Sequence, residues 1–268
     1  RDQPRSRGLG DVYKRQALFL AMGIFALAFV VLYFVNIPEP HIVKTSAKKE
    51  KSKHSALSFR HFVLGTVAIF IYVGVEVGIP NFANLFMTSP EINIDPTIAG
   101  SVVGTYWFLM MIGRLCGASI GAKVSSRAML TVVSTVGIAL VLGAIFCADN
   151  ILVNMPVFKS DISFGFAQVP VNVMLLILCG LCTSVMWGGI FNLAVEGLGK
   201  YTAAASGLFM VMVCGGGILP LIQGGVADFA GFLNSYWVIA LGLAYILFYA
   251  AIGSKNVNTD IPTDDYEA

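Results

Sequence analysis

Long runs of hydrophobic residues recur along the chain, separated by shorter polar stretches. A helix needs roughly 20 apolar residues to cross the hydrocarbon core of a bilayer. Seven runs approach or reach that length, at about 17–35, 62–86, 98–121, 128–148, 171–195, 203–227 and 232–252. They lack the regular alternation of a membrane β-barrel and are longer than its strands. The pattern therefore predicts an all-α polytopic membrane protein with seven helices.

The composition agrees with a membrane location and offers no sign of enzymatic chemistry. Hydrophobic residues make up 57% of the chain and charged residues only 12%, with a mean hydropathy of +0.80. These values lie outside those of soluble domains. The sequence has no Walker A loop, no His-Glu-x-x-His and no Gly-x-Ser-x-Gly. We therefore expect neither an enzyme nor a nucleotide-driven pump, and no cofactor or metal.

The positive charges predict which ends of the helices face the cytoplasm, because cytoplasmic loops retain Lys and Arg. If residues 36–60 are inside, the outer segments after residue 60 hold only Lys159. The inner segments then hold Lys44, Lys48, Lys49, Lys51, Lys53, Arg60, Lys123, Arg127, Lys200 and Lys255. We expect residues 36–60 and the C-terminal tail to be cytoplasmic.

The first sixteen residues, RDQPRSRGLGDVYKRQ, break this charge pattern, since they lie one span away from the basic loop and are themselves basic. They also lack the plan of a signal peptide. We expect residues 1–16 to be a non-native leader. Because the rest starts abruptly at an apolar run, we expect the chain to be the C-terminal part of a longer protein.

One carboxylate stands in the middle of an apolar run, in FIYVGVEVGIPNFANLFM. A charge at this depth costs about 2.5–3.5 kcal/mol even on a lenient scale, so such residues usually face a cavity and serve transport. Glu76 is therefore the first candidate site residue, although it could instead cap a free carbonyl of a neighbouring helix. Tyr72 precedes it by four residues, on the same helical face. Pro80 permits a bend that would turn Asn81 and Asn84 toward the same cavity.

Small residues, which allow helices to approach closely in a membrane, gather in three later segments. These are GRLCGASIGA (113–122), GLCTSVMWGG (180–189) and CGGGILPLIQGG (214–225). The glycines at 215–217, followed by Pro220, weaken helical hydrogen bonding. Such a weak point suits either a gate or tight packing.

Three segments carry a resemblance to a known family: YVGVEVGIPNF, GRLCGASIGA and IFNLAVEGLGKYTAAASGLFMVMVCGGGILP. Together they resemble the C-terminal half of a sugar transporter of the major facilitator superfamily, in the fucose/galactose/glucose–proton symporter family. The resemblance covers nearly all residues from 17 onward and implies helices six to twelve. It implies a last N-terminal-bundle helix at 17–35, a central loop at 36–60, a six-helix C-terminal bundle at 61–252 and a tail at 253–268.

The resemblance implies an importer of a monosaccharide that works by cation symport, with H⁺ favoured over Na⁺, in the inner (plasma) membrane. Transport would proceed by alternating access between two bundles. The chain would hold half of the sugar site and would need the missing N-terminal bundle. The alternatives are an exporter of drugs or organic anions, and a channel or scaffold subunit. No Lys lies mid-span to favour an organic anion.

The resemblance bears on the role of Glu76, and the other candidates follow from residue type and position in the spans. The resemblance favours sugar contact over proton coupling for Glu76. Mid-span Trp187 could stack on a pyranose ring, although aromatic residues in membrane helices are more often interfacial anchors. Sugar-binding candidates are Glu76, Tyr72, Asn81, Asn84, Trp187 and Asn192, with Gln223, Tyr106 and Trp107 as weaker ones. Arg114, Glu196 and Asp228 lie at or near span ends. We expect these three to form interhelical or gate ion pairs.

The charge asymmetry generates a topology prediction. Reporter fusions at Lys53 and at Asp265 should both report a cytoplasmic position, because the basic segments all lie on that side. An external position at either residue would contradict the predicted orientation.

Overall fold

The structure, a computed structural model, describes residues 19–20, 22–35, 54–147, 150–159, 163–258 and 260–263. It divides into two units, residues 1–52 and 53–268, which are described separately. In the first unit an apolar helix, shorter than a full membrane crossing, runs from Met22 to Phe34. The predicted leader (1–16), most of the predicted loop (36–53) and the end of the predicted tail (264–268) lie outside the described residues.

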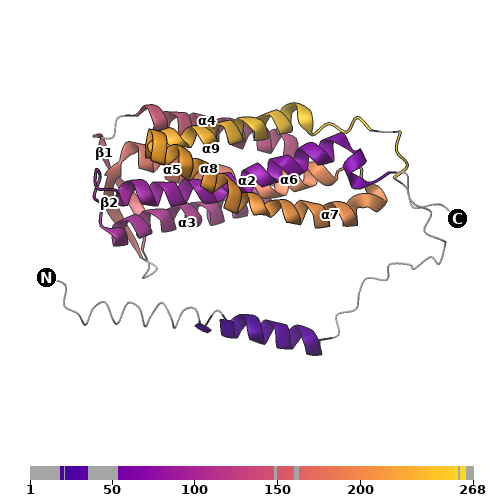
Figure 1. Ribbon diagram of the computed structural model, residues 1–268, viewed down its shortest axis with the longest axis horizontal. Coiled ribbons are helices and arrows are strands. Elements are labelled where there is room, and N and C mark those ends of the chain that lie inside the picture. The colour runs from indigo at the N-terminus through magenta and orange to yellow at the C-terminus, as the bar shows by residue number, and fades with distance from the viewer. Residues whose placement is uncertain are drawn as a thin grey trace. The chain divides into compact units, whose positions relative to one another are not determined.

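The second unit is a bundle of six apolar spans whose axes are roughly aligned (Figure 1). The spans are Arg60–Thr88, Pro96–Gly121, Ser126–Phe146, Val171–Val195, Gly199–Ala230 and Phe232–Gly253. All six runs predicted between residues 62 and 252 are confirmed as helical spans. Each prediction depended only on local hydropathy, which is why it succeeded without knowledge of packing.

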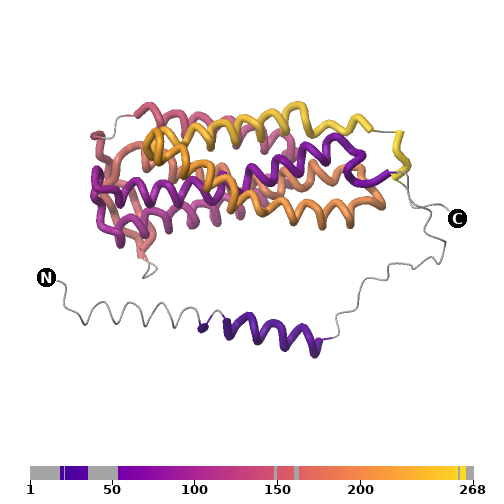
Figure 2. Tube along the Cα trace, viewed as in Figure 1, coloured from indigo at the N-terminus to yellow at the C-terminus, as the bar shows by residue number. Residues whose placement is uncertain are grey.

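Three spans are continuous helices and three are interrupted. The continuous spans are α2 (Arg60–Thr88), α3 (Pro96–Gly121) and α4 (Ser126–Phe146). A short turn, η1 (Ala56–Ser58), precedes α2. The fourth span contains α5 (Val171–Thr183) and α6 (Met186–Val195). The fifth span contains η2 (Gly199–Tyr201), α7 (Thr202–Val211), η3 (Met212–Cys214) and α8 (Gly215–Ala230). The sixth span contains α9 (Phe232–Phe248) and a π-helical turn, η4 (Tyr249–Gly253). Figure 2 shows the bend between α7 and α8.

Local sequence sets where two of the helices begin. Asp95 caps α3, its Oδ1 accepting from the backbone N–H of Thr97 at 2.8 Å, and Pro96 occupies the first turn. That bond lowers the pKa of the exposed Asp95 carboxyl. Ser125 caps α4 in the same way through the N–H of Ala128. Both are common helix-start patterns, since Asp and Ser side chains accept from free N–H groups and proline has no N–H that would be left unpaired there.

α2 and the α5–α6 span form the centre of the bundle. In each, 61% of the most apolar stretch is buried within the protein, against 28% in α3 and in α4 and 17% in Gly199–Ala230. The central spans are therefore surrounded mainly by protein. Phe232–Gly253 is intermediate, at 50%, and the other three spans leave broad apolar faces uncovered. Any polar group on a central span must find its partner among the neighbouring helices.

Glycines let α3 approach the α5–α6 span closely. A Cβ on Gly113 would overlap Ser184, and one on Gly117 would overlap Val185. A Cβ on Gly180 would lie 2.5 Å from the backbone oxygen of Tyr106. Two of the three small-residue segments thus face each other, as small-x-x-x-small packing in membranes predicts.

The glycine run of the fifth span packs against α2. A Cβ on Gly215 would overlap the backbone of Phe70, and one on Gly216 would lie 2.8 Å from Val73. On the α2 side, a Cβ on Gly74 would overlap Leu219. Two of the three consecutive glycines are therefore needed for close packing, and the run follows directly on the tight turn η3.

An antiparallel hairpin, which the sequence analysis did not predict, connects α4 to α5. It consists of β1 (Leu152–Phe158) and β2 (Phe164–Pro170), with Met155 opposite Ala167. The N–H of Phe158 donates to Thr105 Oγ1 of α3 at 2.9 Å, and the Phe158 ring stacks on Phe108 at 4.8 Å. These contacts fix the hairpin to the bundle at the end where α3 begins (Figure 1).

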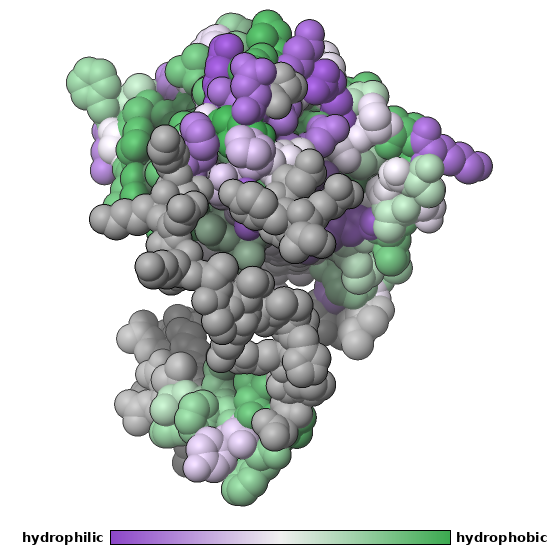
Figure 3. Space-filling view, turned by 90° about the vertical axis from the view of Figure 1, so that its right-hand side faces the viewer, coloured by the Kyte–Doolittle hydropathy of each residue, from purple (hydrophilic) through white to green (hydrophobic). Residues whose placement is uncertain are grey.

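The opposite end of the bundle holds the α6–α7 turn and the C-terminal segment. Gly197 (φ +72°) and Gly199 (φ +49°) have left-handed backbone conformations, which favour glycine. The N–H of Lys200 donates to the carbonyl of Thr263 at 3.2 Å, and the N–H of Arg60 donates to Asn258 Oδ1 at 3.0 Å. Hydrophilic residues gather at this end (Figure 3), as expected of a surface that meets water.

The close approach of α3 and α5 generates a stability prediction. Gly180→Ala should lower the unfolding temperature in detergent, because the new methyl group meets backbone and cannot be relieved by a rotamer change; overpacking typically costs about 1–3 kcal/mol. Gly100→Ala on α3 is the matched control, since no atom lies within 4 Å of its Cβ position. Alanine favours helix there, so that change should be neutral or stabilising. Equal shifts for both would contradict the packing argument.

Candidate functional site

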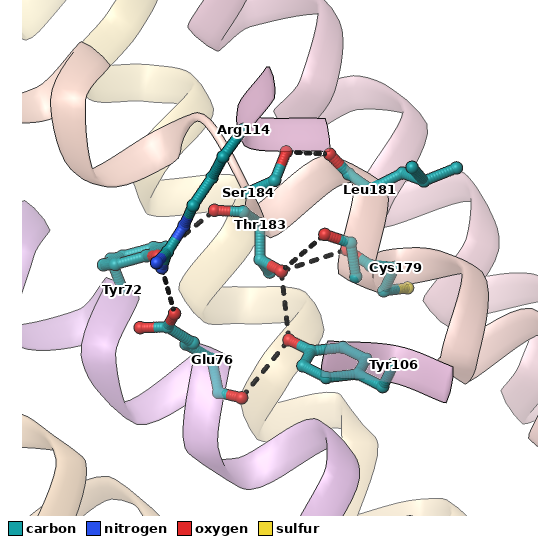
Figure 4. A network of polar contacts seen from close by, with 9 residues as sticks. Tyr72, Glu76, Tyr106, Arg114, Cys179, Leu181, Thr183 and Ser184 are labelled. Atoms are coloured by element: carbon teal, nitrogen blue, oxygen red, sulfur yellow. Dashed lines mark hydrogen bonds and ion pairs between the residues drawn. The ribbon is translucent and has the colours of Figure 1, made fainter. Parts of the chain in front are cut away.

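Glu76 and Tyr72 lie one turn apart near the middle of α2, facing α3 and the α5–α6 span (Figure 4). Glu76 Oε1 accepts a hydrogen bond from Arg114 Nη2 of α3 at 3.1 Å. The Tyr72 hydroxyl is buried and donates to the backbone carbonyl of Thr183 at 3.1 Å. The carboxylate in the apolar run is therefore paired with a cation from the adjacent helix.

Arg114 differs from its predicted position near a span end. It lies well inside α3, at the level of Glu76, with which it forms an ion pair. The two side chains are unequally covered: Glu76 is 13% exposed and Arg114 57% exposed. The carboxylate thus lies at the inner side of the pair, and the Arg114 side chain at the outer side.

A cleft of about 630 Å³ adjoins this pair, and we call it the Arg114 cleft. It lies between the C-terminal half of α3, the start of α4 and the segment from Ser184 to α6. Its lining residues are Arg114, Gly117, Ala118, Gly121, Ser126, Met129, Ser184, Val185, Trp187, Gly188, Gly189 and Asn192. The lining combines a cation, an indole, an amide and two hydroxyls, which are groups that can bind a polar organic molecule.

The break between α5 and α6 contributes several groups to this cleft. α5 ends at Thr183 and α6 begins at Met186. The Thr183 hydroxyl bonds back to the carbonyl of Cys179 at 3.2 Å, and the Ser184 hydroxyl bonds to that of Leu181 at 2.6 Å. Such back-bonding competes with the regular helix pattern and often bends helices. The Thr-Ser pair therefore lies at the point where the span is interrupted.

Trp187 and Asn192 join Arg114 at the cleft. The Trp187 ring packs edge-on against Tyr72, with centroids 6.2 Å apart, and against Phe209 at 6.1 Å. Its neighbour Gly188 has open space at its Cβ position. Asn192 Nδ2 lies 3.5 Å from Ser126 Oγ and also lines a second cavity of about 490 Å³. Arg114, Trp187 and Asn192 thus line the cleft, whereas Glu76 and Tyr72 do not line it and contact Arg114 and Trp187 from behind the lining.

The other predicted residues lie elsewhere. Asn81 is exposed and Asn84 half-buried, both farther along α2 than Pro80, and neither lines the Arg114 cleft. Glu196 lies at the end of α6, lines the second cavity, and accepts at its backbone carbonyl from His61 Nε2 at 2.9 Å. Asp228 is exposed near the end of α8. Within the described residues neither Glu196 nor Asp228 forms a salt bridge, and their gate role stays a prediction.

Three hydroxyl groups near the site were not singled out from sequence. The Thr183 hydroxyl bonds with the Tyr106 hydroxyl, and Ser184 and Ser126 line the cleft. Tyr106, a weaker candidate, is fully buried; its hydroxyl lies 3.2 Å from the Glu76 carbonyl and 3.0 Å from Thr183 Oγ1 (Figure 4). A Thr-Ser pair inside an apolar run was the available signal. Hydroxyls are common in membrane helices, so the pair alone did not indicate a site.

Comparison with known proteins identifies similar chains. A family model described as the Major Facilitator Superfamily matches residues 7–220. The chain is 31% identical over 237 residues to a glucose/galactose transporter of Brucella abortus, covering 87% of the chain and 53% of that protein. It is 30% identical over 253 residues to a putative glucose/galactose transporter of Helicobacter pylori, covering 92% and 56%. The chain spans about half the length of these curated relatives.

Solved structures share the fold. A crystal structure of the fucose:proton symporter of Escherichia coli matches with a TM-score of 0.70 over 95% of this chain and 60% of that one. The sequence identity of this pair is 21%, so the likeness describes the arrangement of helices.

The unequal burial of the ion pair generates a stability prediction. Arg114→Met should lower the stability of the chain in detergent by about 1–3 kcal/mol, because the inner carboxylate loses its charged partner. Adding Glu76→Gln should recover part of that loss, since no unpaired carboxylate then remains. Lys123→Met is the control. Lys123 is an exposed cation beyond the end of α3, so its replacement should change stability little. An equal loss with and without Glu76→Gln would show that the pair does not matter.

Proposed function

Because the chain belongs to the Major Facilitator Superfamily, we propose that it is the C-terminal part of a secondary active transporter that imports a monosaccharide. The sugar would be of the fucose, galactose and glucose class, and the coupling ion a cation, H⁺ in the first place. The chain is a multi-pass membrane protein of a transporter family rather than an enzyme. The support for sugar transport comes from the names of its relatives.

The proposal gives each segment a place in the whole transporter. Residues 17–35 are the last helix of the N-terminal bundle, residues 36–60 the cytoplasmic central loop, residues 61–252 the C-terminal bundle and residues 253–268 a cytoplasmic tail. The N-terminal bundle belongs to the part of the relatives that this chain does not span. The complete protein lies in the inner (plasma) membrane and works by alternating access, with the sugar held between two bundles.

The observation that carries the proposal is the ion pair at the Arg114 cleft. Glu76 and Arg114 cancel each other's charge, so the cleft favours a neutral polar substrate over an anion. A carboxylate accepts hydrogen bonds and a guanidinium donates them, which together match sugar hydroxyls that do both. Trp187 offers an apolar ring face to the C–H side of a pyranose, and Asn192 a further donor and acceptor.

The same observation weighs against the alternatives. An exporter of organic anions needs an uncompensated cation, whereas Arg114 is already paired. A channel would give flux that rises linearly with concentration, whereas a carrier saturates. Asn81 and Asn84 remain predicted sugar contacts from α2, available if the second bundle closes over that part of the helix.

Substitution of Glu76 tests the proposed sugar site. In the full-length transporter, Glu76→Ala should weaken binding of D-glucose, D-galactose or L-fucose by roughly 10- to 150-fold, because a charge-assisted hydrogen bond is worth ~1.5–3 kcal/mol. Glu76→Gln keeps an acceptor oxygen and should cost clearly less. Binding can be measured by calorimetry, and uptake in proteoliposomes.

Two outcomes would contradict this proposal. If Glu76→Gln preserved sugar exchange but removed pH-driven accumulation, Glu76 would be a proton carrier instead of a sugar acceptor. Proteoliposomes with the 268-residue chain alone should show no sugar-competed uptake, since half of the site is missing. Saturable uptake by that chain alone would rule out the half-transporter interpretation.

A further inference from the structure

The backbone carbonyl of Glu76 lacks the partner that a regular helix would provide. In an α-helix each carbonyl accepts from the N–H four residues later. For Glu76 that residue is Pro80, which lies inside α2 and has no N–H. An unpaired carbonyl at membrane depth is strongly unfavourable, so another donor has to replace the missing one.

Tyr106 of α3 provides this donor. Its buried hydroxyl lies 3.2 Å from the Glu76 carbonyl and 3.0 Å from Thr183 Oγ1. A carbonyl can only accept, and a tyrosine has one hydroxyl proton. Tyr106 therefore donates to Glu76 whenever that bond is made. It then accepts from the Thr183 hydroxyl when the Thr183 proton points to Tyr106 and not to the carbonyl of Cys179.

Thr183 connects this contact to the interruption of the fourth span. It is the last residue of α5, and its carbonyl accepts from the Tyr72 hydroxyl at 3.1 Å. Two tyrosines, one from α3 and one from α2, thus bond to the same residue at the break (Figure 4). The proline position of α2 and the α5–α6 break are joined by a continuous set of hydrogen bonds.

α2 also contains a matched contact without a proline. Tyr245 of α9 donates through its hydroxyl to the carbonyl of Leu64 at 3.2 Å. Four residues after Leu64 stands Ala68, which keeps its N–H. Loss of the Tyr245 hydroxyl therefore leaves a carbonyl with a helical donor, whereas loss of the Tyr106 hydroxyl leaves one with none.

We propose that Tyr106 is a positioning residue that replaces the N–H missing at Pro80 and so holds Glu76 against Arg114, with α2 and the α5–α6 break fixed to each other. Its effect on sugar binding rests on the proposed function of Glu76. Its effect on the backbone of α2 does not, and the two are tested separately.

The backbone role is tested by a double-mutant cycle read as unfolding temperature of the full chain in detergent. Tyr106→Phe should lower the unfolding temperature by about 2–6 °C, because a buried carbonyl loses its donor. In the Pro80→Ala background the helix supplies its own N–H, and the same substitution should have clearly less effect. Tyr245→Phe, the control, should cost the same in both backgrounds. An equal cost of Tyr106→Phe in both backgrounds overturns the proposal.

The positioning role is tested by sugar affinity in the full-length transporter, with D-galactose, D-glucose and L-fucose as probes. Tyr106→Phe should weaken the affinity for the transported sugar roughly 2- to 12-fold, the range of one lost hydrogen bond, although it removes no group from the cleft lining. Tyr245→Phe should leave it unchanged. If Tyr106→Phe lowered thermal stability but left sugar affinity unchanged, Tyr106 would have a structural role only and its positioning role would be overturned. If the wild-type transporter binds none of these sugars, the proposed function fails while the thermal cycle still decides the backbone role.

Discussion

A polar group in the middle of an apolar span must be satisfied by protein, because lipid offers no hydrogen bond and no counter-charge. Glu76 has two such groups, a carboxylate and a backbone carbonyl that lacks its helical donor because residue 80 is proline, and it lies in one of the two most buried spans. Arg114 satisfies the first and Tyr106 the second. Both come from α3, so the register of α3 against α2 is fixed by chemistry as well as by apolar packing.

The close packing of small residues makes these contacts possible. Gly180 allows the backbone of α5 to meet that of α3 at Tyr106, and Gly113 and Gly117 admit the residues at the α5–α6 break. With larger residues α3 and α5 would lie farther apart, and the Tyr106 hydroxyl would lie farther from Thr183. The same approach defines the Arg114 cleft, since its lining includes Gly117 on one side and Ser184 and Val185 on the other.

The parts of this structure that depend on local sequence could be predicted, and the parts that depend on register could not. Hydropathy predicted all six spans of the second unit, and the cost of a mid-span charge singled out Glu76 with its neighbour Tyr72. The partner of Glu76 was not predicted, because the depth of Arg114 relative to α2 follows from how two helices slide against each other. The hairpin was not predicted, because each strand has only seven residues, too few for the sequence pattern to distinguish it from a connecting segment. The role of the Thr183 hydroxyl required the break in its helix to be known.

The contact between the α6–α7 turn and the C-terminal segment has a practical consequence for work with this protein. Thr263 lies against Gly199, since a Cβ on Gly199 would overlap the backbone of Thr263. Asn258 accepts a hydrogen bond from the N–H of Arg60, the first residue of α2. The segment from Asn258 to Thr263 therefore contacts the bundle at the start of α2 and at the α6–α7 turn. An affinity tag or fluorescent protein joined close behind Thr263 would press on those helix ends, so a cleavable tag behind a flexible spacer is the safer choice for purification.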